Sequence, residues 1–449
     1  MLTFKRGHDI GFFAQQLFPG GRDVSKETKN AGEAYDLTKK LLEENVQTIY
    51  EATFIYKGVL VMVDILNFEN EIYTAYEVKS SIKISETYLR DSCLQYYVLK
   101  NSLANFNDLF LTTMNGDYVL EGNVDPKKLF KRRSVKKEAE KNLEYFDKKI
   151  EDAGLVLEMN AIPNISIGKH CFKPYQCDFF NTCWKDVVSA ESVFNLPFIN
   201  KDKLFEWHDS GVKTISGIDD TQIENQTHLK IKDSFISNLP VVHLDKIASI
   251  LSSVKPPFAA IDMEIWAPAL PQLQGTRPFQ QIPFLFCMSD GNTNDCFLAE
   301  HVADTRKEFA RELVERTKAY NTLLVYDKTM EELAIKGLKD VAPELAEDLE
   351  AVKNKFVDLF EIFRNLYYYH PAFKNNFSLK MISEVFNTGV TYTGIQSGLE
   401  AMNYFERLRN TEDPSEKSKT REELISYCLS DAQATLKLAE YLQNLIKTQ

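Results

Sequence analysis

The chain carries acidic residues at the ends of apolar, strand-like segments in two places that are far apart in the sequence. The first set is Asp64 followed by Glu77-Val78-Lys79, and the second begins with Asp262-Met263-Glu264. A carboxylate at the end of a buried strand must be paired, hydrated or bound to a cation, because an isolated charge is expensive to bury. Two such sets predict an α/β protein with two separate centres that hold divalent metal against a phosphodiester.

The length of 449 residues exceeds what one ordinary hydrophobic core holds, so we expect more than one domain. The pattern divides the chain into a first block over residues 1–185, a small helical connector over 186–250 and a last block over 251–449. The first block predicts three strands, a helix and a further strand: Glu51–Tyr56, Val59–Leu66, Ile72–Lys79, Ser85–Leu103 and Asp108–Thr113.

The last block predicts three strands in succession, then a helix, a fourth strand and further helices. These segments are Phe258–Glu264, Ile282–Met288, Cys296–His301, Thr305–Tyr320 and Leu323–Tyr326. That order favours a mixed α/β sheet.

The net charge of −12 argues against a passive nucleic-acid binder, whose affinity comes mostly from neutralising phosphates. It does not exclude a nuclease, because carboxylates that bind metal count as negative until the metal arrives. The longest apolar run, Val59–Leu66, is interrupted by Asp64 and is far shorter than the roughly 18 residues of a membrane span. No apolar segment follows a basic start, so we expect a cytoplasmic protein with no membrane partner.

A basic stretch between Lys127 and Lys137 is predicted to begin a helix that continues to about Ile150. Within it Lys131, Arg132 and Arg133 are candidate nucleic-acid-binding residues. The alternative is a solvated helix face with no binding role.

In the first acidic set, Glu77 and Lys79 are two apart and share one face of a strand. If the strands pair as a hairpin, Asp64 lies beside Glu77. Two carboxylates would then bind Mg²⁺ or Mn²⁺, and Lys79 would orient or activate the nucleophile. The alternative is a solvent-facing acid beside a Glu–Lys pair.

In the second set, Asp262 and Glu264 again share a strand face, and Tyr427 and Asp431 are four apart on a predicted helix. The tyrosine hydroxyl would position the attacking water, while Asp431 shares metal with Asp262. Two metal ions about 4 Å apart would clamp the attacking and leaving oxygens. The alternative is an ordinary pair of strand-end acids with an exposed aspartate.

Three of the seven cysteines, Cys171, Cys177 and Cys183, are clustered, which indicates a metal or iron–sulfur site rather than disulfides in a reducing compartment. The other four are predicted to be small buried residues: Cys93, Cys287, Cys296 and Cys428.

The order Asp64, Glu77-Val78-Lys79 and Gln95-Tyr96-Tyr97 resembles the PD-(D/E)XK restriction-endonuclease-like core of RecB-type and CRISPR-associated exonucleases over roughly residues 1–185. The resemblance implies that Asp64 and Glu77 bind metal and that Lys79 and Gln95 are catalytic. It also implies that Cys171, Cys177 and Cys183 hold a [4Fe–4S] cluster whose fourth ligand is not evident. A zinc site and a loop without metal remain alternatives.

The order Asp262-x-Glu264 and Tyr427-x-x-x-Asp431 resembles the DEDDy branch of the RNase H-like 3′–5′ exonucleases. That resemblance places Glu331 at the intermediate acid position, four residues after Asp327, and implies four metal-binding acids: Asp262, Glu264, Glu331 and Asp431. The two blocks together look like a bacterial family that joins a RecB-type nuclease to an exonuclease-like domain of unknown function.

The function expected from these resemblances is that of a divalent-metal-dependent DNA exonuclease, acting in repair or defence, with nucleic acid as its partner. Two alternatives stay open. One is an RNA-directed 3′–5′ exonuclease with a single active module, and the other is a nucleic-acid-binding scaffold in which one or both sites are degenerate.

Overall fold

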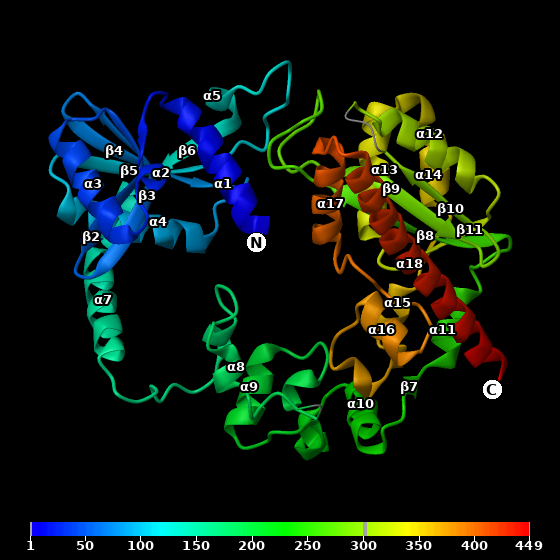
Figure 1. The fold of residues 1–449 in the computed structure, drawn as a ribbon. Helices are drawn as coiled ribbons and strands as arrows, with labels where there is room; N and C mark the ends of the chain where they lie inside the picture. Colours follow the sequence, from blue (N-terminus) through cyan, green and yellow to red (C-terminus); the bar gives the residue numbers. More distant parts are fainter. Residues whose placement is uncertain (1, 190, 300–302, 449) are drawn as a thin grey trace. The chain divides into compact units, whose positions relative to one another are not determined.

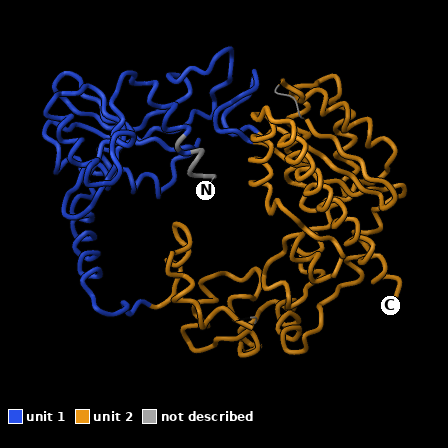
Figure 2. The backbone as a smooth tube through the Cα atoms, in the orientation of Figure 1, with its two compact units in different colours: residues 1–165, 267–280 blue, residues 166–266, 281–449 orange. Residues whose placement is uncertain are grey.

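The computed structural model describes residues 2–189, 191–299 and 303–448. The chain forms two compact units (Figure 2). Unit 1 comprises residues 1–165 and 267–280, and unit 2 comprises residues 166–266 and 281–449. Both contain strands and helices, so the expected α/β class is confirmed at that level (Figure 1).

Unit 1 contains one sheet and several helices. Its elements are α1 (Leu2–Ala14), η1 (Gln15–Leu17), β1 (Arg22–Asp23), α2 (Val24–Glu27), α3 (Ala31–Glu43), β2 (Thr48–Tyr56), β3 (Val59–Glu69), β4 (Ile72–Lys79), α4 (Glu86–Ser102), β5 (Phe106–Met114), α5 (Pro126–Leu129), β6 (Phe130–Ser134), α6 (Lys136–Lys141) and α7 (Leu143–Leu157). The strand order is β1-β2-β3-β4-β5-β6. Strands β2, β3 and β4 are antiparallel neighbours, and β5 runs parallel to β4.

Short left-handed turns set the register of these strands. Lys57 and Gly58 both have positive φ where β2 turns into β3, and Asn70 and Glu71 do the same between β3 and β4. Such turns match the twist of paired antiparallel strands. Ser85 then begins α4, because its side chain accepts a hydrogen bond from the backbone N–H of Tyr88.

The predicted basic helix is wrong. Lys131, Arg132 and Arg133 lie on β6, an edge strand that pairs with β5 and separates the short helix α5 from α6, which begins at Lys136. All three side chains are exposed, while Phe130 at the start of the strand is buried. A run of like charges gives no periodicity that separates a helix from a strand, and charged side chains suit an edge strand because they discourage further pairing.

Residues 267–280 follow the strand β8 (Phe258–Trp266) in the chain but belong to unit 1. The backbone of Leu120 donates to Thr276 O at 2.9 Å and accepts from Gly275 N at 2.8 Å. The side chain of Gln274 bonds to the backbone N–H and C=O of Gly122. These long-range pairings have no local sequence signal, which is why this segment was predicted with the last block.

Unit 2 contains the remaining elements. They are η2 (Lys169–Cys171), α8 (Phe180–Cys183), η3 (Val193–Asn195), α9 (Lys201–Asp209), η4 (Ile215–Gly217), η5 (Asp220–Gln222), α10 (Gln226–Ser237), β7 (Val241–Val242), α11 (Leu244–Leu251), β8, β9 (Ile282–Ser289), β10 (Asn294–Leu298), α12 (Arg306–Thr317), β11 (Thr322–Val325), α13 (Thr329–Val341), η6 (Pro343–Leu345), α14 (Ala346–Lys353), β12 (Phe356–Asp358), α15 (Phe360–Arg364), β13 (Tyr368–Tyr369), η7 (Pro371–Phe373), α16 (Leu379–Val385), α17 (Gly398–Asn410) and α18 (Pro414–Lys447).

The main sheet of unit 2 has the strand order β10-β9-β8-β11-β12. Strand β8 pairs antiparallel with β9 and parallel with β11, and β12 runs parallel to β11. The long helix α18 packs against β8 and β9 (Figure 1). Pro414 at its first turn and the Asp413 side chain, which accepts from Ser415 N, begin this helix. The central strand β8 therefore lies beneath α18.

The division into units differs from the predicted boundaries at 185 and 250. Trp184 packs with Cys171 and Phe205 in one apolar cluster, so the cysteine segment joins the helices that follow it. Those helices in turn share a core with the sheet of unit 2, because Ile231 and Leu442 lie in the same cluster. The connector is helical as expected, but it packs as part of unit 2.

The predicted strands of the last block are present as β8, β9, β10 and β11, while β12 was not foreseen because it spans only three residues. His301, the predicted end of one strand, lies outside the described residues.

Cys93 and Cys428 are buried and free as expected, but Cys287 and Cys296 form a disulfide between facing positions of β9 and β10. Within the described ranges no helix combines the length and apolar character that a membrane crossing needs.

Candidate functional site

Three carboxylates from two elements of unit 2 converge. Asp262 and Glu264 project from one face of β8, and Asp431 comes from α18 above that strand. Ligand oxygens of the three residues all lie within 4.8 Å of one another. This cluster can bind a divalent metal ion, since carboxylate oxygens are the ligands that hard cations take.

The electrostatics of the cluster favour the binding of a cation. Burial and the neighbouring charges of Asp431 and Glu331 raise the pKa of Glu264 to about 8. Burial and the same neighbours, together with Glu264, raise the pKa of Asp262 well above its usual value. Asp262 Oδ2 is buried and, among the described residues, has no hydrogen-bond partner. Carboxylates this close cannot all ionise without a compensating positive charge.

Glu331 lies close to the cluster without being one of the three converging residues. It is in the first turn of α13, is 5% exposed, and its Oε2 has no partner within the described part of the chain. Burial and the charges of Asp327 and Asp358 raise the pKa of Glu331 to about 8. Its charge also raises the pKa of Asp262 and Glu264, so it adds to the same negative field.

The turn that leads into α13 depends on Asp358, to which the sequence assigned no role at the site. Asp327 has a left-handed φ of 61°. Its backbone N–H donates to Asp358 Oδ1 at 2.9 Å, and Phe360 N donates to the same oxygen at 2.9 Å. Asp358 thus fixes the turn four residues before Glu331. The only sequence feature that indicates this role is that Asp358 is an acidic residue at the end of the three-residue strand β12.

Two tyrosines and a lysine lie beside Asp431. Tyr427 is one turn before Asp431 on α18, as predicted, and the Tyr392 hydroxyl donates to Asp431 Oδ1 at 2.7 Å. The Lys380 ammonium lies 4.5 Å from the ring centre of Tyr392 and 5.0 Å from that of Tyr427, and it donates to Gln396 O at 2.6 Å. Tyr392 was missed because it lies in an irregular segment between α16 and α17, where spacing has no meaning.

In unit 1 the hairpin predicted around the first acidic set is present. Ile65 pairs with Tyr76 across β3 and β4, so Asp64 and Glu77 occupy the next facing positions. Asp64 Oδ2 accepts a hydrogen bond from Val78 N at 2.5 Å. Lys79 Nζ donates to Glu77 Oε1 and to Asp91 Oδ2, both at 2.8 Å. The sequence did not single out Asp91, although it lies one helical turn before Gln95 on α4.

Burial is the largest cause of the raised pKa values of Asp64 and Glu77 in unit 1. It raises the pKa of Glu77 to about 8, with the charge of Asp64 as the next cause. It raises the pKa of Asp64 to about 7, with the charge of Glu51 as the next cause. Burial lowers the pKa of Lys79, but the charges of Glu77 and Asp91 outweigh it and leave that pKa above its usual value.

The three clustered cysteines do not form a ligand set in the described residues. Cys171 is buried, Cys177 is half-buried and Cys183 is exposed. Their sulfur atoms are not among the groups whose ligand atoms lie within 4.8 Å of one another. The arrangement therefore does not fit a [4Fe–4S] cluster or a zinc ion, and no chemistry is derived from one.

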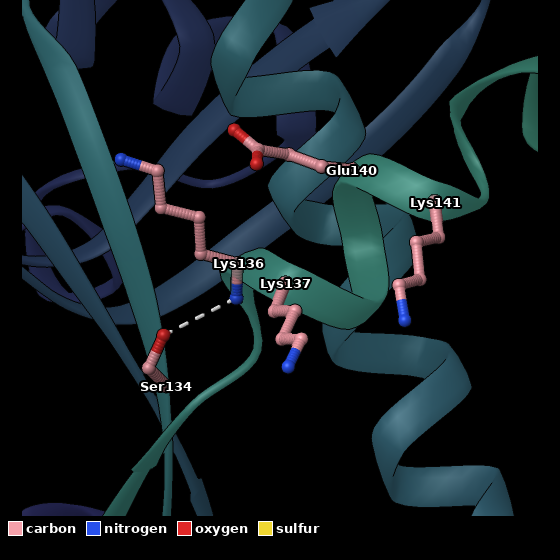
Figure 3. A pocket seen from close by; sticks show the side chains of 5 residues that line it. All are labelled: Ser134, Lys136, Lys137, Glu140 and Lys141. Carbon is pink, nitrogen blue, oxygen red and sulfur yellow. Dashed lines mark hydrogen bonds between the residues drawn. The ribbon is translucent and has the colours of Figure 1, made fainter.

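The candidate nucleic-acid-binding residues line the exposed edge of unit 1. Lys131 pairs with Asp117 at 2.7 Å, Arg133 pairs with Glu138, and the Arg132 guanidinium lies 5.7 Å from the ring centre of Tyr76. Beyond β6, an open pocket of about 500 Å³ is lined by Ser134, Lys136, Lys137, Glu140 and Lys141 (Figure 3). The backbone N–H of Lys136 donates to Ser134 Oγ at 3.3 Å, which joins the strand to α6. Asp117 and Glu138 thus offset part of the positive charge of Lys131 and Arg133.

Residues 259–378, under half of the chain, match a family described as "Domain of unknown function (DUF2779)". No curated protein matches the chain. Among solved structures, the family B DNA polymerase from the hyperthermophilic archaeon Pyrobaculum calidifontis is 21% identical with a TM-score of 0.28. That overlap covers 43% of this chain and only 25% of the polymerase, and a likeness this low supports no inference about fold or activity. The family match covers both Asp262 and Glu264, and Glu331 as well, but not Asp431.

Proposed function

We propose that unit 2 is a divalent-metal-dependent nuclease that hydrolyses phosphodiester bonds from the end of a DNA strand, with an RNase H-like DEDDy arrangement of its acids. The observation that carries this proposal is the convergence of Asp262, Glu264 and Asp431 within 4.8 Å. The buried, unpartnered Asp262 Oδ2 adds support, because an unsatisfied buried carboxylate oxygen costs about 1–3 kcal/mol unless a cation or proton satisfies it.

The chain's own residues have distinct roles in this proposal. Asp262, Glu264 and Asp431 bind Mg²⁺ or Mn²⁺, and Glu331 contributes a fourth acid. Bound metal would neutralise charge on the phosphate and lower the pKa of a coordinated water. Tyr427 orients that water from one turn away on α18. The positive charge of Lys380, which acts to lower the pKa values of Glu264 and Asp431, would stabilise negative charge that develops on the phosphate.

Unit 1 supports a second candidate nuclease centre of the PD-(D/E)XK kind. Asp64 and Glu77 would bind the cation, Lys79 would orient the nucleophile, and Gln95 would contact the substrate side of the site. The position of the Lys79 ammonium, 2.8 Å from Glu77 Oε1, favours this assignment. Lys131, Arg132 and Arg133 on the exposed strand β6 would then bind the nucleic-acid backbone.

An RNA-directed exonuclease and a scaffold with degenerate sites remain the competing functions. The unpartnered buried oxygens of Asp262, Glu331 and Glu77 count against a scaffold, since a site that has lost its metal has no reason to keep them.

The test is a cleavage assay on matched single- and double-stranded DNA and RNA oligonucleotides, each labelled at the 5′ or the 3′ end. Reactions contain Mg²⁺, Mn²⁺ or EDTA. The proposal expects metal-dependent release of short products from DNA, with one labelled end retained. Cleavage of RNA alone would favour the first competing function, and binding without metal-dependent cleavage of any substrate would favour the scaffold.

A further inference from the structure

The first turn of α17 lies beside Glu264 of the carboxylate cluster. Helix α17 packs against β8, the strand that carries Glu264 (Figure 1). Gly398 is the first residue of this helix, and it is exposed. A Cβ atom added at Gly398 would lie 3.6 Å from Glu264 Oε2 and, among the described residues outside its own turn, would meet no other heavy atom within 4 Å. The glycine therefore leaves room beside Glu264 that a larger side chain would fill.

Two backbone N–H groups at the start of α17 have no acceptor in the described part of the chain. Ser397 caps the helix, since its side chain accepts from Glu400 N at 3.3 Å and its carbonyl accepts from Ala401 N at 2.9 Å. These bonds leave the N–H groups of Gly398 and Leu399. The first N–H groups of a helix lack intrahelical partners, and together with the helix dipole they favour a bound anion.

Hydrogen bonds hold the residue before the cap in place. Gln396 N donates to Glu400 Oε2 at 2.9 Å, and Gln396 O accepts from Lys380 Nζ at 2.6 Å. Ile395, the residue before it, is fully buried. The start of α17 is thus fixed next to the cluster before any ligand binds, which lowers the entropic cost of binding.

The side chain of Glu264 gives independent evidence for a ligand in this space. It is 6% exposed and forms no hydrogen bond or ion pair with another described residue. Its Oε2 is the atom nearest to the Cβ position of Gly398. A buried carboxylate without a partner is costly, so it requires a cation. That cation would supply positive charge on one side of the space, and the N–H groups of α17 supply it on the other.

We propose that the first turn of α17 binds the phosphate group of the terminal nucleotide through the N–H groups of Gly398 and Leu399. The inference rests on the proposed function and names where its substrate phosphate is held. Glycine is suited to position 398 because it leaves room for this phosphate beside Glu264. A free nucleoside monophosphate carries the same group and would bind at the same place.

The test measures binding of dAMP to the full, Mn²⁺-loaded chain by calorimetry. Glu77→Gln serves as the background, because it weakens the candidate centre of unit 1. Deoxyadenosine, which lacks the phosphate, is expected to bind at least about tenfold more weakly than dAMP, since hydrogen bonds to charged groups contribute this much. Inorganic phosphate is expected to compete with dAMP. Equal affinities for dAMP and deoxyadenosine would overturn the proposal.

Gly398→Pro removes one of the two N–H groups. Proline is favoured at the first position of a helix, and Ser397 has the extended backbone that proline requires before it, with φ −155° and ψ 155°. The matched comparison is Gly398→Ala, which also adds a Cβ but keeps the N–H. Gly398→Pro is expected to bind dAMP about tenfold more weakly than Gly398→Ala, at the same Mn²⁺ affinity. Equal dAMP affinities would overturn the proposal, and a loss of Mn²⁺ affinity in Gly398→Pro alone would assign the position to metal support instead.

Gly398→Val tests the open space without proline. It keeps the N–H but places a branched side chain beside Glu264, so dAMP is expected to bind about tenfold more weakly than to Gly398→Ala. Equal dAMP affinities in these two variants would contradict the proposal.

Cleavage of end-labelled DNA separates this inference from the proposed function. A parent chain that cleaves no nucleic acid but binds dAMP as expected would reject the nuclease and leave the phosphate site. A parent chain that cleaves DNA, with the same KM in Gly398→Pro and Gly398→Ala, would reject the phosphate site and leave the nuclease.

Discussion

The Tyr392 hydroxyl donates a hydrogen bond of 2.7 Å to Asp431 Oδ1. This bond ties an irregular segment to a carboxylate that converges with Asp262 and Glu264. It occupies one oxygen of Asp431 and fixes the direction in which the other points. Hydrogen bonds of this kind orient metal ligands, and their loss commonly costs about 10–100-fold in metal affinity or activity.

Tyr392→Phe is therefore expected to weaken Mn²⁺ binding to unit 2 by about tenfold or more, because Asp431 loses the donor that orients it. Calorimetric titration of the full chain measures the change. Tyr369→Phe is the matched control, since the Tyr369 hydroxyl is buried and has no partner among the described residues. Equal Mn²⁺ affinities in the two variants would show that Tyr392 does not support the site.

Metal binding to unit 2 should strengthen as the pH rises from 6 to 8. Burial raises the pKa of Glu264 to about 8, so at pH 6 this group holds a proton that a cation must displace. Mn²⁺ titrations at both pH values in two buffers of different ionisation enthalpy measure affinity and proton release. To isolate unit 2, the titrations use the Glu77→Gln variant. An affinity that does not change with pH, with no proton release, would contradict the crowded, protonated state of the cluster.

Without metal, the stability of the protein should fall as the pH rises. The folded-state pKa values of Glu264 and Glu331, about 8, lie above the ordinary value of 4.5. For an acid whose pKa is raised by folding, the stability contribution is fully present below the ordinary pKa and is lost as the pH rises through the folded pKa. Thermal unfolding in EDTA between pH 5 and pH 8 should show this decline.

Glu264→Gln removes one of the groups responsible, so its Tm should fall less over the same range, at about 2–4 °C for each kcal/mol. Added Mg²⁺ should raise the Tm of the parent most at pH 8, where the carboxylates are ionised. A Tm in EDTA that rises steadily from pH 5 to pH 8 would contradict the account.

The pair Asp358→Ala and Asp358→Asn tests the support of Glu331. Asp358 Oδ1 accepts backbone hydrogen bonds from both Asp327 and Phe360. Alanine leaves both half-buried donors without this acceptor and should destabilise unit 2 by about 1–3 kcal/mol. Asparagine keeps an accepting oxygen and should stay within about 1 kcal/mol of the parent. Urea unfolding followed by circular dichroism measures both, and equal losses in the two variants would assign the effect to charge instead.

Residues that share a strand or helix face could be predicted from the sequence. The two-residue spacing of Asp262 and Glu264 and the four-residue spacing of Tyr427 and Asp431 are local properties of their elements. The pairing of Asp64 with Glu77 also followed from one short turn between β3 and β4. Each of these relationships depends on few residues that are close in the chain.

Relationships between distant or irregular segments could not be predicted. Tyr392 reaches Asp431 from a segment without secondary structure, where residue spacing predicts no contact. Residues 267–280 join unit 1 through backbone hydrogen bonds to Leu120. Such bonds do not depend on which side chains these residues carry, so the sequence does not mark them. The basic run around Arg132 was assigned to a helix because uniform charge carries no period, while its strand is defined by pairing with β5.

The most direct test of the central claim is the rate of Mg²⁺-dependent cleavage of end-labelled single-stranded DNA by the parent chain, Asp262→Asn and Lys79→Ala. The account predicts metal-dependent release of nucleotides by the parent, loss of about 10²-fold or more in Asp262→Asn, and retained end-directed cleavage in Lys79→Ala. Cleavage by Asp262→Asn at the parent rate, or no cleavage by the parent in either Mg²⁺ or Mn²⁺, would contradict it.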